Sequence, residues 1–169
     1  LPLSFLAEMF GISLAYGYKL TLLLSDFALL CVLNQILVGR QRLVLFAYWL
    51  SPVVVLTTYG LGLNDVIPAL YLMLGLLFMK TGRFKVSGVF VALAISAKLS
   101  MLIALPFMSL YLYKNKPLRR SIYDFGIGFI AALVIFGLPF LASTSAMGML
   151  FRNPEMSEIL SLSFEVSKG

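Results

Sequence analysis

Apolar runs and short polar islands alternate along the chain. Three of the islands are basic: GRQR at 39–42, KTGRFK at 80–85 and KNKPLRR at 114–120. A helix needs about 20 apolar residues to cross a bilayer, and most runs between the islands reach or approach this length. The pattern therefore predicts an all-α fold, a polytopic bundle of about six transmembrane helices, some of them short or re-entrant.

The expected helices differ in length. Four are expected at 16–38, 43–58, 65–79 and 122–141. Segments 86–97 and 99–113 are short for normal spans, and Lys98 separates them. Either this pair crosses a thinned or tilted region of the membrane, or it forms a buried hairpin. Both alternatives place Lys98 at the end opposite the basic islands.

The two ends of the sequence carry mixed apolar and charged residues. The chain begins at Leu1 and ends in a polar segment, so we expect a single transmembrane domain over 1–169 that is an internal fragment of a longer protein. In segment 142–169, aromatic and leucine residues alternate with charges, which is typical of an amphipathic helix on a membrane surface. We expect this segment to face outward.

Composition supports the membrane interpretation. The chain is 61% hydrophobic and has a mean hydropathy of +1.00, which excludes an ordinary soluble domain. Its net charge of +6 does not indicate nucleic acid, because most of the 13 basic residues lie in the three islands, where the positive-inside rule expects them. We expect an integral multi-pass protein with cytoplasmic basic loops, in the plasma membrane of a bacterium or the endoplasmic reticulum of a eukaryote.

The residue inventory limits the chemistry. Cys31 is the single cysteine and there is no histidine, which excludes an intrachain disulfide, a Cys- or His-based zinc site and a histidine-based triad. Catalysis would therefore use a carboxylate, lysine, arginine or tyrosine. A divalent metal is compatible with such chemistry, but no cluster of ligands requires one.

Charged residues inside apolar runs need a reason, since each costs about 2.5–3.5 kcal/mol at a helix centre. Lys19 and Asp26 lie seven residues apart, on one face of the first expected helix. They could form a buried pair or a polar clamp between helices, or they could both line a polar cavity.

A second polar group lies in TTYGLGLNDVIPAL, residues 57–70. Asp65 stands at the start of the third expected helix, where a carboxylate can cap free backbone N–H groups. The glycines before it would also let the backbone approach a ligand, and Asn64 adds a second polar group on the same outer side. Lys98 is expected at that same end, where it either reaches the headgroups or binds a phosphate.

The order of these features resembles the GT-C class of integral membrane glycosyltransferases, most closely the polyprenyl-phosphate-mannose-type mannosyltransferases and their bacterial relatives. YKLTLLLSDFALL is similar to a family helix with lysine and aspartate in the places of Lys19 and Asp26. Leu50–Ser51–Pro52 precedes a G-x-N-D-like loop that ends at Asp65. SGVFVALAISAK, ending at Lys98, and LIALPF complete the resemblance, which covers about residues 15 to 115.

The resemblance implies transfer of a sugar, with mannose favoured, from a polyprenyl-phosphate donor to a glycan or glycolipid acceptor on the outer or lumenal face. Asn64 and Asp65 would shape the substrate pocket, Lys98 would hold the leaving phosphate, and Lys19 and Asp26 would support the cavity wall. The family's catalytic acidic loop would lie upstream of this chain. Two alternatives remain open: a transporter or flippase-like bundle lined by the same charges, and a noncatalytic membrane subunit.

Overall fold

The computed structural model describes residues 14–60 and 65–141. Expectations for 1–13, Asn64 and the tail 142–169 fall outside these residues. The contacts within the chain divide it into two units, 1–133 and 134–169, and helix α8 crosses the boundary. The description below concerns the first unit and the described end of α8.

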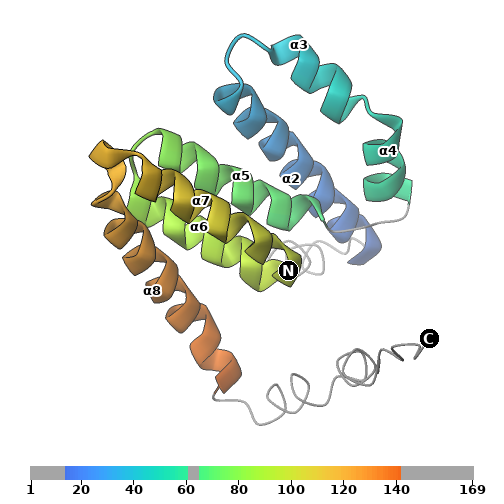
Figure 1. Ribbon diagram of the computed structural model, residues 1–169. Helices are drawn as coiled ribbons and strands as arrows, with labels where there is room; N and C mark the ends of the chain where they lie inside the picture. Colours follow the sequence, from blue (N-terminus) through green and yellow to red (C-terminus); the bar gives the residue numbers. More distant parts are fainter. Residues whose placement is uncertain (1–13, 61–64, 142–169) are drawn as a thin grey trace, which may run out of the picture. The chain divides into compact units, whose positions relative to one another are not determined.

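The described residues form helices joined by short turns, with no strand among them, which confirms the all-α prediction (Figure 1). The long elements are α2 (Leu14–Ile36), α5 (Val66–Lys80), α6 (Phe84–Ala97), α7 (Ala104–Lys114) and α8 (Ser121–Leu141). Shorter elements are α3 (Gln41–Val44), η1 (Leu45–Trp49), α4 (Pro52–Val55), η2 (Leu56–Gly60), η3 (Leu99–Ile103) and η4 (Lys116–Leu118).

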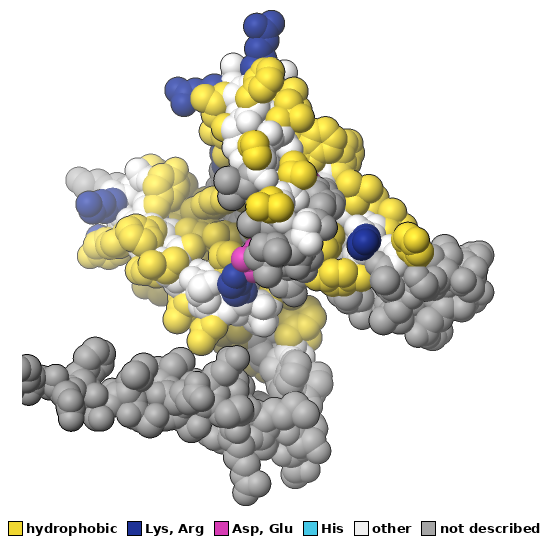
Figure 2. Space-filling model, turned by 90° about the vertical axis from the view of Figure 1, so that its right-hand side faces the viewer, with side chains coloured by type: hydrophobic (Ala, Val, Ile, Leu, Met, Phe, Trp, Pro, Cys, Tyr) yellow, Lys and Arg dark blue, Asp and Glu magenta, His cyan; other side chains and the backbone are white. Residues whose placement is uncertain are grey.

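Two of the described helices are long and apolar enough to cross a membrane. These are Tyr16–Ile36 in α2 and Ser121–Leu138 in α8. Many large hydrophobic side chains are exposed, among them Phe46, Phe107 and Ile130, each more than 60% exposed. Figure 2 shows hydrophobic side chains spread over the described surface of one face, between a few lysines and arginines. Such a surface is suited to contact with lipid rather than with water.

The second expected span, 43–58, is not one continuous helix. It consists of α3 and η1, then a break at Ser51, then α4 and η2. Pro52 begins α4, and proline has no N–H to donate to the preceding turn, so the helix cannot run through it. Before the break, η1 is π-helical, and the N–H of Leu50 donates to the carbonyl of Leu45 at 2.9 Å. The single-helix expectation for this segment was therefore wrong.

Helices α5 and α6 form a tight hairpin. Gly82 has a φ of +78°, a left-handed conformation that glycine adopts without strain, and it turns the chain between the two helices. Inside the hairpin, the buried hydroxyl of Ser87 donates a 2.7 Å hydrogen bond to the carbonyl of Gly75. Small residues and a buried hydroxyl are what helices use to approach closely in a membrane.

The first part of α8 packs closely against α6. A Cβ atom at Gly88 would lie 2.1 Å from the carbonyl oxygen of Phe125, and one at Gly128 would lie 2.0 Å from that of Lys85. Only glycine fits at these two contacts. The core around α6 is apolar and contains Met79, Val91, Ile95, Met108, Leu112 and Phe125.

The break at Lys98 that the sequence predicted is present. Helix α6 ends at Ala97, Lys98 is extended with φ −152° and ψ 114°, and η3 leads into α7. Helices α5, α6 and α7 pack around a shared cluster that contains Met79, Val91 and Met108 (Figure 1). The segment 86–113 is therefore a helical hairpin rather than one long helix.

Candidate functional site

The candidate site is an ion pair between two polar residues from separate turns. Asp65 directly precedes α5, and Lys98 directly follows α6. Because α5 and α6 are antiparallel neighbours, the start of one and the end of the other meet at the same end of the hairpin. The Nζ atom of Lys98 lies 2.6 Å from Oδ1 of Asp65.

Asp65 uses its side chain for this pair and not for capping. The residue occupies the position before the first turn of α5, as the sequence predicted, but its carboxylate makes no capping hydrogen bond. Its backbone is already helical, with φ −62° and ψ −17°, so the side chain is not placed as in an ordinary cap. The capping interpretation of Asp65 was wrong, and the contact with Lys98 takes its place.

The pair is open to solvent. The side chain of Lys98 is 42% exposed and that of Asp65 is 53% exposed. Exposed pairs of this kind contribute at most about 1 kcal/mol to stability, so this contact is a weak structural support. A lysine ammonium carries three N–H donors and an aspartate two acceptor oxygens, so both groups keep capacity for a ligand while paired.

The basic islands lie at the other end of the same helices. Lys80, the last residue of α5, donates a 2.9 Å hydrogen bond from Nζ to the carbonyl of Ile36, the last residue of α2. Lys85, in the first turn of α6, lies 3.6 Å from Oδ1 of Asp124 in α8. At about 1.5 Å per residue, the 15 residues of α5 separate this end from Asp65 by about 22 Å. The structure thus gathers the cationic turns at one end and the Asp65–Lys98 pair at the other.

The expected site also included Asn64 and the glycines Gly60 and Gly62, which precede Asp65 in the sequence. Asn64 and Gly62 lie outside the described residues. Gly60, at the end of η2, is described, and a Cβ atom there would come 3.2 Å from Cδ1 of Leu56. The tight contact at Gly60 is thus with its own segment.

The other expected cluster, Lys19 with Asp26, is not assembled as a pair. Asp26 is buried, with 1% of its surface exposed, and accepts hydrogen bonds from the hydroxyl of Tyr48 and, at 3.0 Å, from Nε1 of Trp49. Lys19 lies on the same helix but is exposed. Asp26 therefore joins α2 to η1, in agreement with a polar clamp between helices.

Sequence reasoning missed Tyr48 and Trp49. Both donate hydrogen bonds to a buried carboxylate on a neighbouring helix. Two adjacent aromatic residues with hydrogen-bond donors, in the span after a helix that carries a buried acid, were the available signal. Their 22- and 23-residue separations from Asp26 gave no local pattern to identify them as partners.

A metal site is not visible in the described part of the chain. Among those residues, no group of three or more histidine, cysteine, aspartate or glutamate side chains is placed to hold an ion. The expectation that a metal is compatible but not required stays a prediction.

Comparison with known protein families gives a match over most of the chain. The model of a family described as glycosyltransferase family 87 matches residues 1–157. No curated protein and no solved structure matches the chain. The match covers the Asp65–Lys98 pair, the Asp26 clamp and all the described helices.

Proposed function

The chain belongs to glycosyltransferase family 87, and we propose that it is part of a membrane enzyme that transfers a sugar from a polyprenyl-phosphate donor to a glycan or glycolipid acceptor. Mannose is the proposed sugar, which would make the enzyme a hexosyltransferase of the GT-C class. The observation that carries the proposal is the Asp65–Lys98 pair. We place this pair at the outer or lumenal face and the basic turns in the cytoplasm, in a multi-pass arrangement.

The role proposed for Lys98 follows from the charge that develops in the reaction. When the acceptor oxygen bonds to the anomeric carbon, the bond from that carbon to the donor phosphate breaks, and negative charge grows on the phosphate oxygens. A lysine already held in place stabilises this charge without having to reorganise. Asp65 fixes Lys98 from one side at 2.6 Å, and the exposed part of the ammonium remains available to phosphate.

The role proposed for Asp65 is positioning and substrate contact. Its second carboxylate oxygen can accept a hydrogen bond from a sugar or acceptor hydroxyl, and Asn64 next to it would add an amide. The general base that takes the proton of the acceptor would belong to an acidic loop upstream of this chain. The apolar surface of the helices suits the polyprenyl tail of the donor.

The test is sugar transfer from labelled polyprenyl-phosphate sugars in membranes that carry the full-length protein. Asp65→Asn and Lys98→Ala should each lower transfer by about 100-fold or more, the scale of losing one charge-stabilising group. The matched controls are Asp124→Asn and Lys85→Ala, which remove an exposed ion pair at the basic end. The controls should keep nearly full transfer at equal protein levels.

A charge reversal separates a substrate contact from a structural pair. The double variant Asp65→Lys/Lys98→Asp keeps opposite charges at the two positions but exchanges them. If the pair only held the helices together, the reversal would recover activity. We expect it to stay inactive, because the cation has moved away from the phosphate; recovered transfer, or full transfer in both single variants, would reject the assignment.

A further inference from the structure

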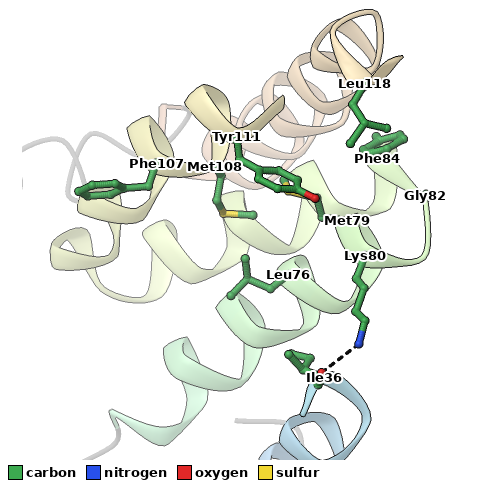
Figure 3. Close-up of a pocket in the computed structure, with 10 residues that line it drawn as sticks. All are labelled: Ile36, Leu76, Met79, Lys80, Gly82, Phe84, Phe107, Met108, Tyr111 and Leu118. Atoms are coloured by element: carbon green, nitrogen blue, oxygen red, sulfur yellow. Dashed lines mark hydrogen bonds between the residues drawn. The ribbon is translucent and has the colours of Figure 1, made fainter. Parts of the chain in front are cut away.

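A pocket of about 500 Å³ lies between α2, α5 and α7, toward the basic end of the helices (Figure 3). Leu76 on α5 and Met108 on α7 point toward each other across it, and Tyr111 lies one turn further along α7. Its volume is in the range of sites that hold small molecules. The pocket does not include Asp65 or Lys98, so it is separate from the proposed transfer site.

The wall of the pocket is apolar except at one end. Its lining is mostly hydrophobic and includes Leu76, Phe107 and Met108, with Lys80 as the only charged residue among those that line it. Lys80 is exposed, and its ammonium already donates to the carbonyl of Ile36 at 2.9 Å. That bond holds the ammonium at the rim, and two of its three N–H donors remain for a ligand.

The surroundings of Lys80 are strongly cationic. The three basic islands contribute Arg40, Arg42, Lys80, Arg83, Lys85, Lys114, Lys116, Arg119 and Arg120. The described acid among these turns is Asp124, and Lys85 lies 3.6 Å from it. The guanidinium of Arg119 lies over the ring of Tyr113, with 4.4 Å from Cζ to the ring centroid, and donates to its hydroxyl. This end of the molecule is thus matched to a ligand that carries negative charge.

From this combination we infer that the pocket binds an anionic phospholipid, with an acyl chain against the apolar wall and the phosphate at Lys80. A free phosphate would not use the apolar wall, and a neutral lipid would gain little from the cations. Basic pockets between membrane helices on the cytoplasmic side are suited to anionic headgroups, because anionic lipids are concentrated in that leaflet. Sugar transfer is not required for this binding.

The experiment counts phospholipid retained by the purified full-length protein. The protein in non-ionic detergent is titrated with phosphatidylglycerol or with phosphatidylcholine of the same chains, and bound lipid is counted by native mass spectrometry. Phosphatidylglycerol should bind saturably and at least about tenfold more tightly than phosphatidylcholine, because its headgroup keeps a net negative charge that the nearby cations attract, whereas the choline of phosphatidylcholine neutralises its phosphate.

Three variants locate the site. Lys80→Gln removes the cation and should weaken phosphatidylglycerol binding about tenfold. Leu76→Trp fills the pocket but leaves Lys80 in place, so it should weaken binding even if Lys80→Gln fails to fold. Arg42→Gln is the matched control, because it removes one exposed positive charge at the same end without touching the pocket; its binding should stay within about twofold.

Several results would overturn the inference. Equal binding of the two lipids would show that the pocket does not recognise the negative charge of the headgroup. An equal loss in Arg42→Gln and Lys80→Gln would show diffuse attraction to the basic end instead of a site. Unchanged binding in Leu76→Trp would show that the acyl chain lies elsewhere, and saturation by a second copy of the protein in place of lipid would assign the pocket to self-association.

Discussion

Gly128 of α8 lies so close to Lys85 of α6 that a Cβ atom at Gly128 would stand 2.0 Å from the Lys85 carbonyl oxygen. No carbon atom can occupy that position without moving the backbone of one helix. The close contact between α6 and the first part of α8 therefore requires glycine at position 128.

Replacing Gly128 by alanine should destabilise the protein by about 1–3 kcal/mol, the usual cost of forcing extra atoms into a packed contact. Gly126→Ala is the matched control, because a Cβ atom there would meet nothing within 4 Å. Alanine is also favoured over glycine in a helix by up to about 1 kcal/mol, so the control should be neutral or stabilised. The stability of both variants is measured by unfolding in detergent, with helix content as the signal. Equal stability of the two variants would contradict this packing.

The helices that the sequence predicted best are those that adjoin charged turns. Helices α5, α6 and α8 begin and end within about two residues of the expected limits, because basic residues and Gly82 interrupt otherwise uniform apolar runs. The segment 43–58 was harder, since its apolar pattern continues across Pro52. In that segment the missing N–H of one residue determined the structure, and the hydropathy pattern did not.

Removing the buried carboxylate of Asp26 should destabilise the contact between α2 and η1. Asp26→Ala leaves the donors of Tyr48 and Trp49 without their acceptor, which costs about 1–3 kcal/mol. Tyr48→Phe removes a single donor and should cost less. Trp49 is the only tryptophan in the chain, so its fluorescence reports directly on this contact during unfolding.

Lys19→Ala tests the competing interpretation from the sequence. If Lys19 and Asp26 formed a buried pair, removing either residue would leave an uncompensated charge and cost a similar free energy. Because Lys19 is exposed, we expect the change to stay within about 0.5 kcal/mol of the native protein. A loss as large as that of Asp26→Ala would restore the pairing hypothesis.

Only part of the candidate site could be predicted from the sequence, because spacing along the chain does not show which separate helices meet. The meeting of Asp65 with Lys98 follows from two consecutive antiparallel helices, because the start of one helix and the end of the next lie at the same end. The hydrogen-bond partners of Asp26 come from another helix, and their burial depends on how α2 and η1 pack. Spacing within one helix pointed to Lys19, whereas packing between helices selected Tyr48 and Trp49.

The proposed orientation can be tested with single cysteines, since Cys31 is the single cysteine among these 169 residues. In a Cys31→Ser background, Ser100→Cys places a thiol two residues after Lys98, and Arg83→Cys places one in the basic turn. Both positions are exposed. A membrane-impermeant maleimide added to the outside of sealed cells or vesicles should label position 100 and not position 83, because basic turns are retained in the cytoplasm.

Permeabilising the membrane is the control, and it should make position 83 react as fast as position 100. Labelling of both positions from one side would mean that α6 does not carry the chain across the membrane. Labelling of position 83 alone would place the Asp65–Lys98 pair in the cytoplasm, where a donor phosphate on the outer face could not reach Lys98. The labelling pattern therefore tests the proposed transfer site without relying on enzyme activity.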